Sequence, residues 1–138
     1  MGNEVSVVFL NQLSELERLN EVVETFALEH GLASKLVFEI NLALDELLTN
    51  VISYAFKDTE EHQIQLWIQL ESGLLTLRLE DDGIPFDPTR MADPDVDLAV
   101  EDREIGGLGV FFVKKVMDGL DYKRVEERNV ITLTKSVG

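Results

Sequence analysis

Residues Ile64–Glu80, with the sequence IQLWIQLESGLLTLRLE, decide the fold of this chain. Apolar residues alternate or run together over residues 64–70 and 74–80, which is the pattern of β-strands. The segment Glu71-Ser72-Gly73 between them is a short turn sequence of the kind that joins two strands of a hairpin. The sequence therefore predicts an antiparallel pair of strands in the middle of the chain.

Upstream of this hairpin the apolar residues recur at helical spacing. A strand is expected over residues 3–9, and Ser14 with Glu17 fits the capping box of a first helix that Gly31 ends. A second helix is expected from Ser34 to about Ala55, since apolar residues recur every three or four positions along it. Its predicted apolar stripe consists of Leu36, Ile40, Leu44, Leu47, Val51 and Ala55.

Downstream of the hairpin comes a proline-containing, acid-rich segment, residues 88–105, which is expected to be a lid-like loop. A helix is expected over Val110–Met117, and a second hairpin is expected to turn at Glu127-Arg128-Asn129. This order of elements predicts an α+β fold, a two-layer sandwich with a mostly antiparallel sheet and its helices on one face. Residues 1–138 fit one compact domain.

The composition excludes several classes of protein. The chain has 27 acidic and 12 basic residues and a formal net charge of −15, so nucleic acid and anionic membrane surfaces are not expected as partners. The absence of cysteine excludes disulfides, thiolate zinc sites and cysteine nucleophiles. The N-terminal sequence lacks the pattern of a signal peptide, and no apolar run approaches the ~20 residues of a membrane span. A cytoplasmic protein is expected.

Three stretches carry residues suited to chemistry. The first, LALDELLTN (Leu42–Asn50), places Glu46 and Asn50 four residues apart and therefore on one face of the second helix. A carboxylate and an amide oxygen in that arrangement suit Mg²⁺, or one metal contact and one base. The alternative is a solvated face of an amphipathic helix.

The second stretch, LRLEDDGIPFDP (Leu77–Pro88), ends a strand in Asp81-Asp82-Gly83. A carboxylate fixed at a strand end can accept a hydrogen bond from an exocyclic amine such as that of adenine. Gly83 would let a flat ring lie close to the backbone. The alternative is an ordinary acidic turn.

The third stretch, GGLGVFFVKKVMDG (Gly106–Gly119), places glycines before a helix, where unpaired backbone N–H groups bind phosphate. It is neither a phosphate loop of the GxxxxGK[ST] type nor a dinucleotide fingerprint. The alternative is a plain structural loop. Together, the three stretches describe a nucleotide site distributed over the fold.

The same stretches resemble the motifs of the GHKL ATPases, with ELLTN as the N box, DDGIPFD as the G1 box and GGLGVFFVKKVMD as the G2 box. Within that superfamily the chain is most similar to anti-sigma-factor serine/threonine kinases of the RsbW and SpoIIAB type. The resemblance implies the Bergerat ATP-binding fold, ATP and Mg²⁺ as cofactors, and phosphorylation of a STAS-type anti-anti-sigma protein. It also implies that the chain sequesters a sigma factor or other output protein in a partner-switching pathway.

The resemblance also implies a role for each site residue. Asn50 would hold Mg²⁺ and Glu46 would be the general base toward a serine or threonine hydroxyl. Asp81 would accept the adenine amine, with Asp82 as the alternative, and Gly83 would lie beside the base. The residues that it places at the phosphates are Gly106, Gly107, Leu108 and Gly109. Arg103 in the acidic lid is a further predicted phosphate contact, and the alternative is a surface arginine.

Some features leave alternatives open. Pro85 stands where broader GHKL members carry a second glycine, and the acidic lid would repel a polyanion unless Arg103, Arg90 or Mg²⁺ offsets its charge. His30 and His62 are interpreted as surface residues, which disfavours a histidine kinase. Another alternative is an ATP-binding, partner-sequestering module with little or no kinase activity, against which Glu46 argues. A homodimer through the first helix and the opening strand is implied by the resemblance, but the protein core explains the same apolar residues.

Overall fold

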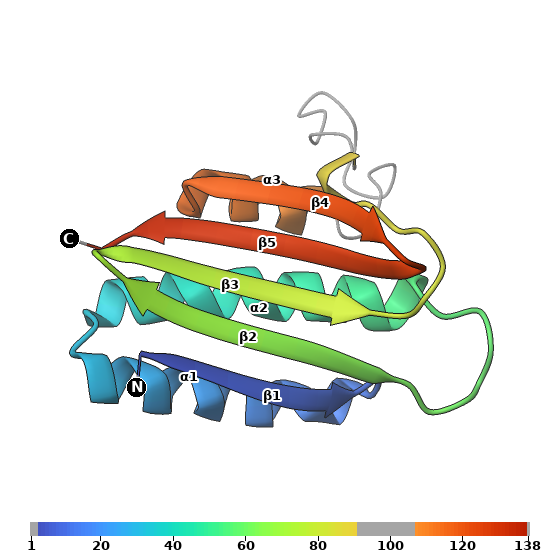
Figure 1. Cartoon of the computed structure of the whole chain (residues 1–138), viewed down its shortest axis with the longest axis horizontal. Helices are drawn as coiled ribbons and strands as arrows, with labels where there is room; N and C mark the ends of the chain where they lie inside the picture. The colour runs from blue at the N-terminus through green and yellow to red at the C-terminus, as the bar shows by residue number, and fades with distance from the viewer. Residues whose placement is uncertain (1–2, 91–106, 138) are drawn as a thin grey trace.

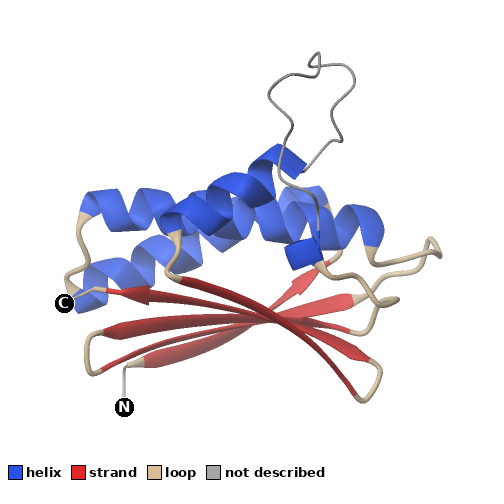
Figure 2. Cartoon of the chain, turned by 90° about the horizontal axis from the view of Figure 1, so that it is seen from above, coloured by secondary structure: helices blue, strands red, loops and turns tan. Residues whose placement is uncertain are grey.

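The computed structural model describes residues 3–90 and 107–137, which form an antiparallel sheet with three helices packed on one of its faces (Figures 1 and 2). In spatial order the strands are β1 (Glu4–Leu10), β2 (Gln63–Glu71), β3 (Leu74–Asp81), β5 (Arg128–Ser136) and β4 (Gly119–Val125). The helices are α1 (Leu16–His30), α2 (Ser34–Tyr54) and α3 (Gly107–Val116). The α+β, two-layer fold predicted from the sequence is confirmed.

The core lies between the helices and the inner face of the sheet. Alternate residues of β3 point to that face, so Leu75, Leu77 and Leu79 are buried while their neighbours are partly exposed. α2 lies in the middle of the helical layer, between α1 and α3 (Figure 1). Its predicted stripe is buried at Ile40, Leu44, Leu47, Val51 and Ala55, whereas Leu36 is half-buried.

The two predicted hairpins are present, but one turn lies elsewhere than expected. The β2–β3 turn has positive φ at Ser72 and Gly73, as two-residue hairpin turns require. In the β4–β5 hairpin the positive φ angles fall on Glu126 and Glu127, so the predicted turn is correct for Glu127 and wrong for Arg128 and Asn129. Val125 pairs with Arg128, so the ladder continues through residues 128 and 129 and places Asn129 inside β5.

The predicted capping box is also wrong. Ser14 lies in a short 3₁₀ turn, η1 (Leu13–Glu15), and α1 begins at Leu16 without a side-chain cap. The reason is a tertiary contact: the Glu15 carboxylate accepts the backbone N–H of Leu10, at 2.8 Å, and pairs with Arg18. The end of α1 is as predicted, since Gly31 adopts the left-handed conformation with φ of 65°.

The elements that carry the predicted site residues lie in one half of the molecule. The C-terminal ends of α2 and β3 and the β4–β5 turn lie at its end, and α3 begins nearer the middle, where it packs on α2 (Figure 1). Of the predicted lid, only residues 88–90 are described, as the 3₁₀ turn η2 (Pro88–Arg90); the rest of it, including Arg103, lies outside the described residues. Within residues 3–90 and 107–137, no helix has the length and apolar character of a membrane span.

Candidate active site

Glu46 and Asn50 face the same side of α2, as their spacing predicts. The Asn50 side chain is only 3% exposed, and its Nδ2 donates a hydrogen bond to Oε1 of Glu46 at 3.2 Å. Burial raises the pKa of the Glu46 carboxyl, and the hydrogen bond from Asn50 partly offsets that rise. Glu46 is therefore a carboxylate held in a fixed position, with a basicity above that of a solvated glutamate.

This pair fits a magnesium ion. Because Asn50 donates its Nδ2 to Glu46, its Oδ1 is the atom that remains to accept a ligand. An amide oxygen beside a carboxylate oxygen is a hard oxygen donor set of the kind that Mg²⁺ uses, with water and phosphate oxygens completing its shell.

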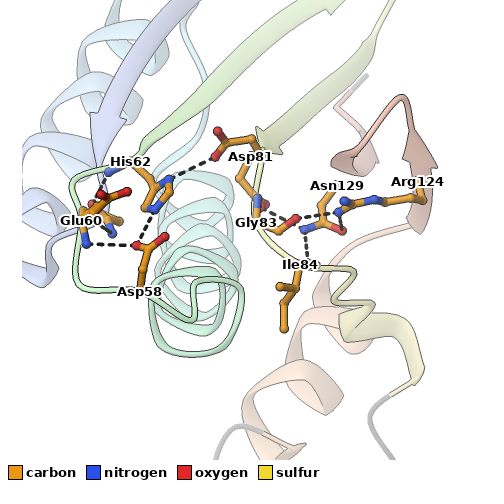
Figure 3. A network of polar contacts seen from close by, with 10 residues as sticks. Asp58, Glu60, His62, Asp81, Gly83, Ile84, Arg124 and Asn129 are labelled. Atoms are coloured by element: carbon orange, nitrogen blue, oxygen red, sulfur yellow. Dashed lines mark hydrogen bonds and ion pairs between the residues drawn. The ribbon is translucent and has the colours of Figure 1, made fainter.

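Of the two neighbouring aspartates, the structure places Asp81 inside the fold. Asp81 is 1% exposed at the end of β3, and its Oδ1 accepts hydrogen bonds from the Gly83 N–H at 2.8 Å and from Asn129 Nδ2 at 2.9 Å (Figure 3). Burial raises the pKa of Asp81, and these two hydrogen bonds oppose the rise. The Asp82 side chain is 55% exposed and faces His62.

Gly83 lies against the C-terminal end of α2. A Cβ at this position would overlap the backbone carbonyl of Ala55 and lie 2.8 Å from its Cβ. The next residue, Ile84, donates its N–H to the same carbonyl at 2.7 Å. Close approach of two backbones thus requires glycine, and it ties the turn after β3 to the helix that carries Glu46 and Asn50.

Replacing Gly83 with alanine is expected to lower the free energy of unfolding by about 1–3 kcal/mol, because the added methyl group would meet backbone rather than a movable side chain. Urea denaturation followed by circular dichroism measures the change. Gly31→Asn is the control, since asparagine tolerates the left-handed conformation of Gly31 and no atom lies within 4 Å of a Cβ there. An unchanged midpoint for Gly83→Ala would contradict the close packing of the turn on α2.

The glycine-rich stretch forms the start of α3, three residues earlier than the predicted helix. Gly107, Leu108 and Gly109 lie in its first turn, and Gly106 lies outside the described residues. The first N–H groups of a helix have no partner within it, and the helix dipole favours anions there. The backbone of residues 107–109 can therefore serve phosphate oxygens from inside the helix rather than from a loop before it.

His62 lies next to this end of the sheet and is half-buried. Its Nε2 lies 2.7 Å from Oδ1 of Asp58 (Figure 3). Its ring stacks on Phe56, and its Nδ1 lies 3.4 Å from Oδ1 of Asp82. The hydrogen bond with Asp58 raises the pKa of His62. His62 thus links the loop before β2 to the turn after β3.

Asn129 is the site residue that the sequence interpretation missed. It is 1% exposed and contacts both Asp81 and the turn that follows β3. The sequence pattern predicts a hairpin turn at Asn129 and so does not indicate a buried residue. Ile131 and Leu133 are buried on alternate positions of β5, and the same alternation places residue 129 on the inner face.

Comparison with known proteins adds to this geometry. The family of histidine kinase-like ATPase domains matches residues 9–135. The serine/threonine-protein kinase BtrW of Bordetella bronchiseptica is 30% identical over 112 residues, which cover 81% of this chain and 79% of that protein. An anti-sigma F factor of Clostridium novyi is 22% identical over 134 residues, covering 97% of this chain and 94% of that protein.

Among solved structures, the RsbU and RsbW domains of a Mycobacterium tuberculosis protein match 97% of this chain with a TM-score of 0.71 and 10% sequence identity. At that identity the likeness shows the shared fold. This chain spans about a third of the length of that one, 32%.

Proposed function

The chain belongs to the histidine kinase-like ATPase domain family, and from this membership we propose that it phosphorylates a serine or threonine of a STAS-type anti-anti-sigma protein. ATP use and the class of protein serine/threonine kinase follow from the family and its named relatives. The anti-sigma relative supports a second state in which the chain sequesters a sigma factor or other output protein. We place this activity in the cytoplasm.

In this proposal different residues of the candidate site bind the adenine, the phosphates and the metal ion of Mg-ATP. Asp81 accepts the adenine amine, Gly83 lies beside the ring, and the first turn of α3 receives the phosphates. Asn50 would hold Mg²⁺, which when bound would neutralise charge on the phosphates. Arg103 and Gly106 remain predicted phosphate contacts outside the described residues.

Glu46 is proposed to accept the proton of the partner's hydroxyl as that oxygen attacks the terminal phosphorus, while the bond from that phosphorus to the β-phosphate oxygen breaks and ADP leaves. Phosphoryl transfer needs positioning and charge neutralisation more than covalent chemistry, so one carboxylate base suffices. Burial raises the pKa of Glu46, and a pKa nearer to the working pH makes a carboxylate a more effective general base. The buried amide of Asn50 that orients Glu46 is the observation that carries the proposal, because a module that only bound ATP would not need a positioned base.

The proposal is tested by incubating the purified chain with γ-labelled ATP, Mg²⁺ and STAS-domain proteins recovered from the same cells. We expect label on a serine or threonine of one of them. Binding of a STAS protein with Mg-ATP present and no label transferred would overturn the kinase assignment and favour a sequestering module.

Replacing Asn50 with alanine is expected to weaken ATP binding about tenfold or more when Mg²⁺ is present and much less when EDTA removes it, because the lost oxygen is proposed to bind the metal. Calorimetric titrations with and without Mg²⁺ measure both affinities. Asn41→Ala, which removes the same side chain elsewhere on α2, is the control. Equal weakening in the two titrations would remove Asn50 from the metal site.

We also propose a homodimer along β1 and α1. β1 is an edge strand of the sheet, and between it and α1 runs a groove of about 290 Å³, whose lining is half apolar (Val5, Val7, Val22 and Phe26) and half polar or charged (Arg18, Glu21, Thr25 and Glu29). Light scattering after gel filtration tests this. A monomer mass at micromolar concentration would contradict it.

A further inference from the structure

Three neighbouring strands place polar side chains side by side on the inner face of the sheet. Asp81 on β3 is paired with Asn129 on β5, and Asn129 is paired with Arg124 on β4. On the other side of Asp81 the same row continues with Ile64 and Phe9, which are buried and apolar. The polar residues are thus confined to the part of the row on β3, β5 and β4 (Figure 3).

Both polar atoms of the buried Asn129 side chain, the donor Nδ2 and the acceptor Oδ1, make hydrogen bonds. Nδ2 donates to Oδ1 of Asp81 at 2.9 Å and to the Ile84 carbonyl at 2.8 Å. Oδ1 accepts the Tyr122 hydroxyl at 2.6 Å, Nη1 of Arg124 at 3.1 Å and the Phe86 N–H at 3.2 Å. Reversing this amide would break four of the five contacts, since only the Tyr122 hydroxyl could accept from Nδ2 instead, so its orientation toward Asp81 is fixed.

Arg124 holds the turn itself. Its Nη1 donates to the Gly83 carbonyl at 2.7 Å as well as to Asn129. The turn is therefore held from two sides, by Arg124 on the sheet and by the Ala55 carbonyl of α2, which accepts the Ile84 N–H. The positive charge of Arg124 also opposes the effect of burial on Asp81.

We propose that Asn129 and Arg124 are positioning residues for base recognition, which rests on the proposed ATP site. They fix the Asp81 carboxylate so that Oδ1 is occupied by Asn129 and the Gly83 N–H, and Oδ2 faces the purine. An ionised carboxylate held this way can only accept a hydrogen bond. The site therefore selects purines with an amino group at position 6 and rejects those with a carbonyl there.

The test compares ATP with inosine triphosphate, which carries a carbonyl in place of the 6-amino group. Calorimetric titration of the native chain is expected to give at least tenfold tighter binding of ATP. Asn129→Asp puts a second carboxylate next to Asp81, so the two groups share a proton and Asp81 becomes able to donate. We expect the preference for ATP to fall about tenfold at pH 6 and to recover partly toward pH 9.

Tyr122→Phe removes one contact of the network and Arg124→Met removes two, neither adding a charge beside Asp81, and we expect each to lower the preference for ATP severalfold. They also keep the test decisive if Asn129→Asp does not fold. Lys123→Gln is the control, because it removes a positive charge from β4 at an exposed position next to Arg124.

A purely structural role would weaken both nucleotides equally, and an unchanged ratio of affinities in Arg124→Met and Tyr122→Phe overturns the inference. If those variants keep the native ratio while the native chain prefers ATP, the ATP site stands without the positioning role. If the native chain binds neither nucleotide, the proposed function and this inference fall together.

Discussion

Replacing Glu46 with glutamine is expected to slow phosphoryl transfer about 1,000-fold while ATP still binds. Glutamine keeps the shape of the side chain and an oxygen that can accept the hydrogen bond from Asn50, but it cannot take a proton from the partner's hydroxyl. General bases contribute roughly 10²–10⁴-fold to rate, which sets the size of the loss. Single-turnover transfer from labelled ATP to the STAS partner measures it, and calorimetry measures binding.

Glu39→Gln is the matched control, because Glu39 is an acidic residue on the same helix, paired with Lys135 at 4.0 Å. It should transfer at the native rate. A rate for Glu46→Gln within about tenfold of the native rate would mean that another group, or the substrate itself, accepts the proton.

The second large effect is expected at Asp81, where asparagine should weaken ATP binding roughly 30- to 100-fold. The asparagine oxygen can still accept from Gly83 and Asn129, so the amide nitrogen would take the place of Oδ2 and point a donor at the donor of adenine. A buried polar group left facing a like group costs about 1–3 kcal/mol. The affinities are measured by calorimetry with Mg-ATP.

Asp82→Asn is the control for this prediction, since Asp82 is exposed and points toward His62. It should leave the affinity for ATP within about threefold of native. If Asp82→Asn lost binding and Asp81→Asn did not, the base would be recognised by the outer aspartate, and the buried network would be structural.

The burial of Asp81 also makes the free energy of unfolding depend on pH. The pKa of Asp81 is raised in the folded chain, so this carboxyl favours folding when protonated and loses that contribution as pH rises through its folded pKa. Asp81→Asn removes the cost of the buried charge. We expect its melting temperature to exceed the native one by roughly 1–3 °C at pH 7–8, with the gain disappearing below the ordinary value of 3.8. A gain that persisted unchanged at pH 3 would contradict this cause.

Local periodicity predicts the elements that depend on it. The alternation around Leu66, Leu77 and Leu79 predicts strands with one buried face, and the spacing of Glu46 and Asn50 places both on one side of a helix. Neither result needs knowledge of distant residues. The fold class and the first half of the site were therefore accessible from the sequence.

Contacts between neighbouring elements, some of them close in the sequence and some far apart, decided what local periodicity could not predict. Ser14 does not cap α1 because Glu15 is drawn to the backbone of Leu10 on β1. Asparagine is common in turns, yet the pairing of β5 with β3 places Asn129 opposite Asp81, which lies 48 positions away in the sequence. The predicted roles in the lid concern residues outside the described part of the chain and stay predictions.

Amide hydrogen exchange of the whole chain, with and without Mg-ATP, tests the central claim most directly, because it reports where the nucleotide binds. We expect slower exchange in the C-terminal half of α2, in the turn that contains Gly83 and in the first turn of α3, with little change in β1 and α1. Unchanged exchange in those three segments at saturating Mg-ATP, or protection confined to the groove between β1 and α1, would contradict it.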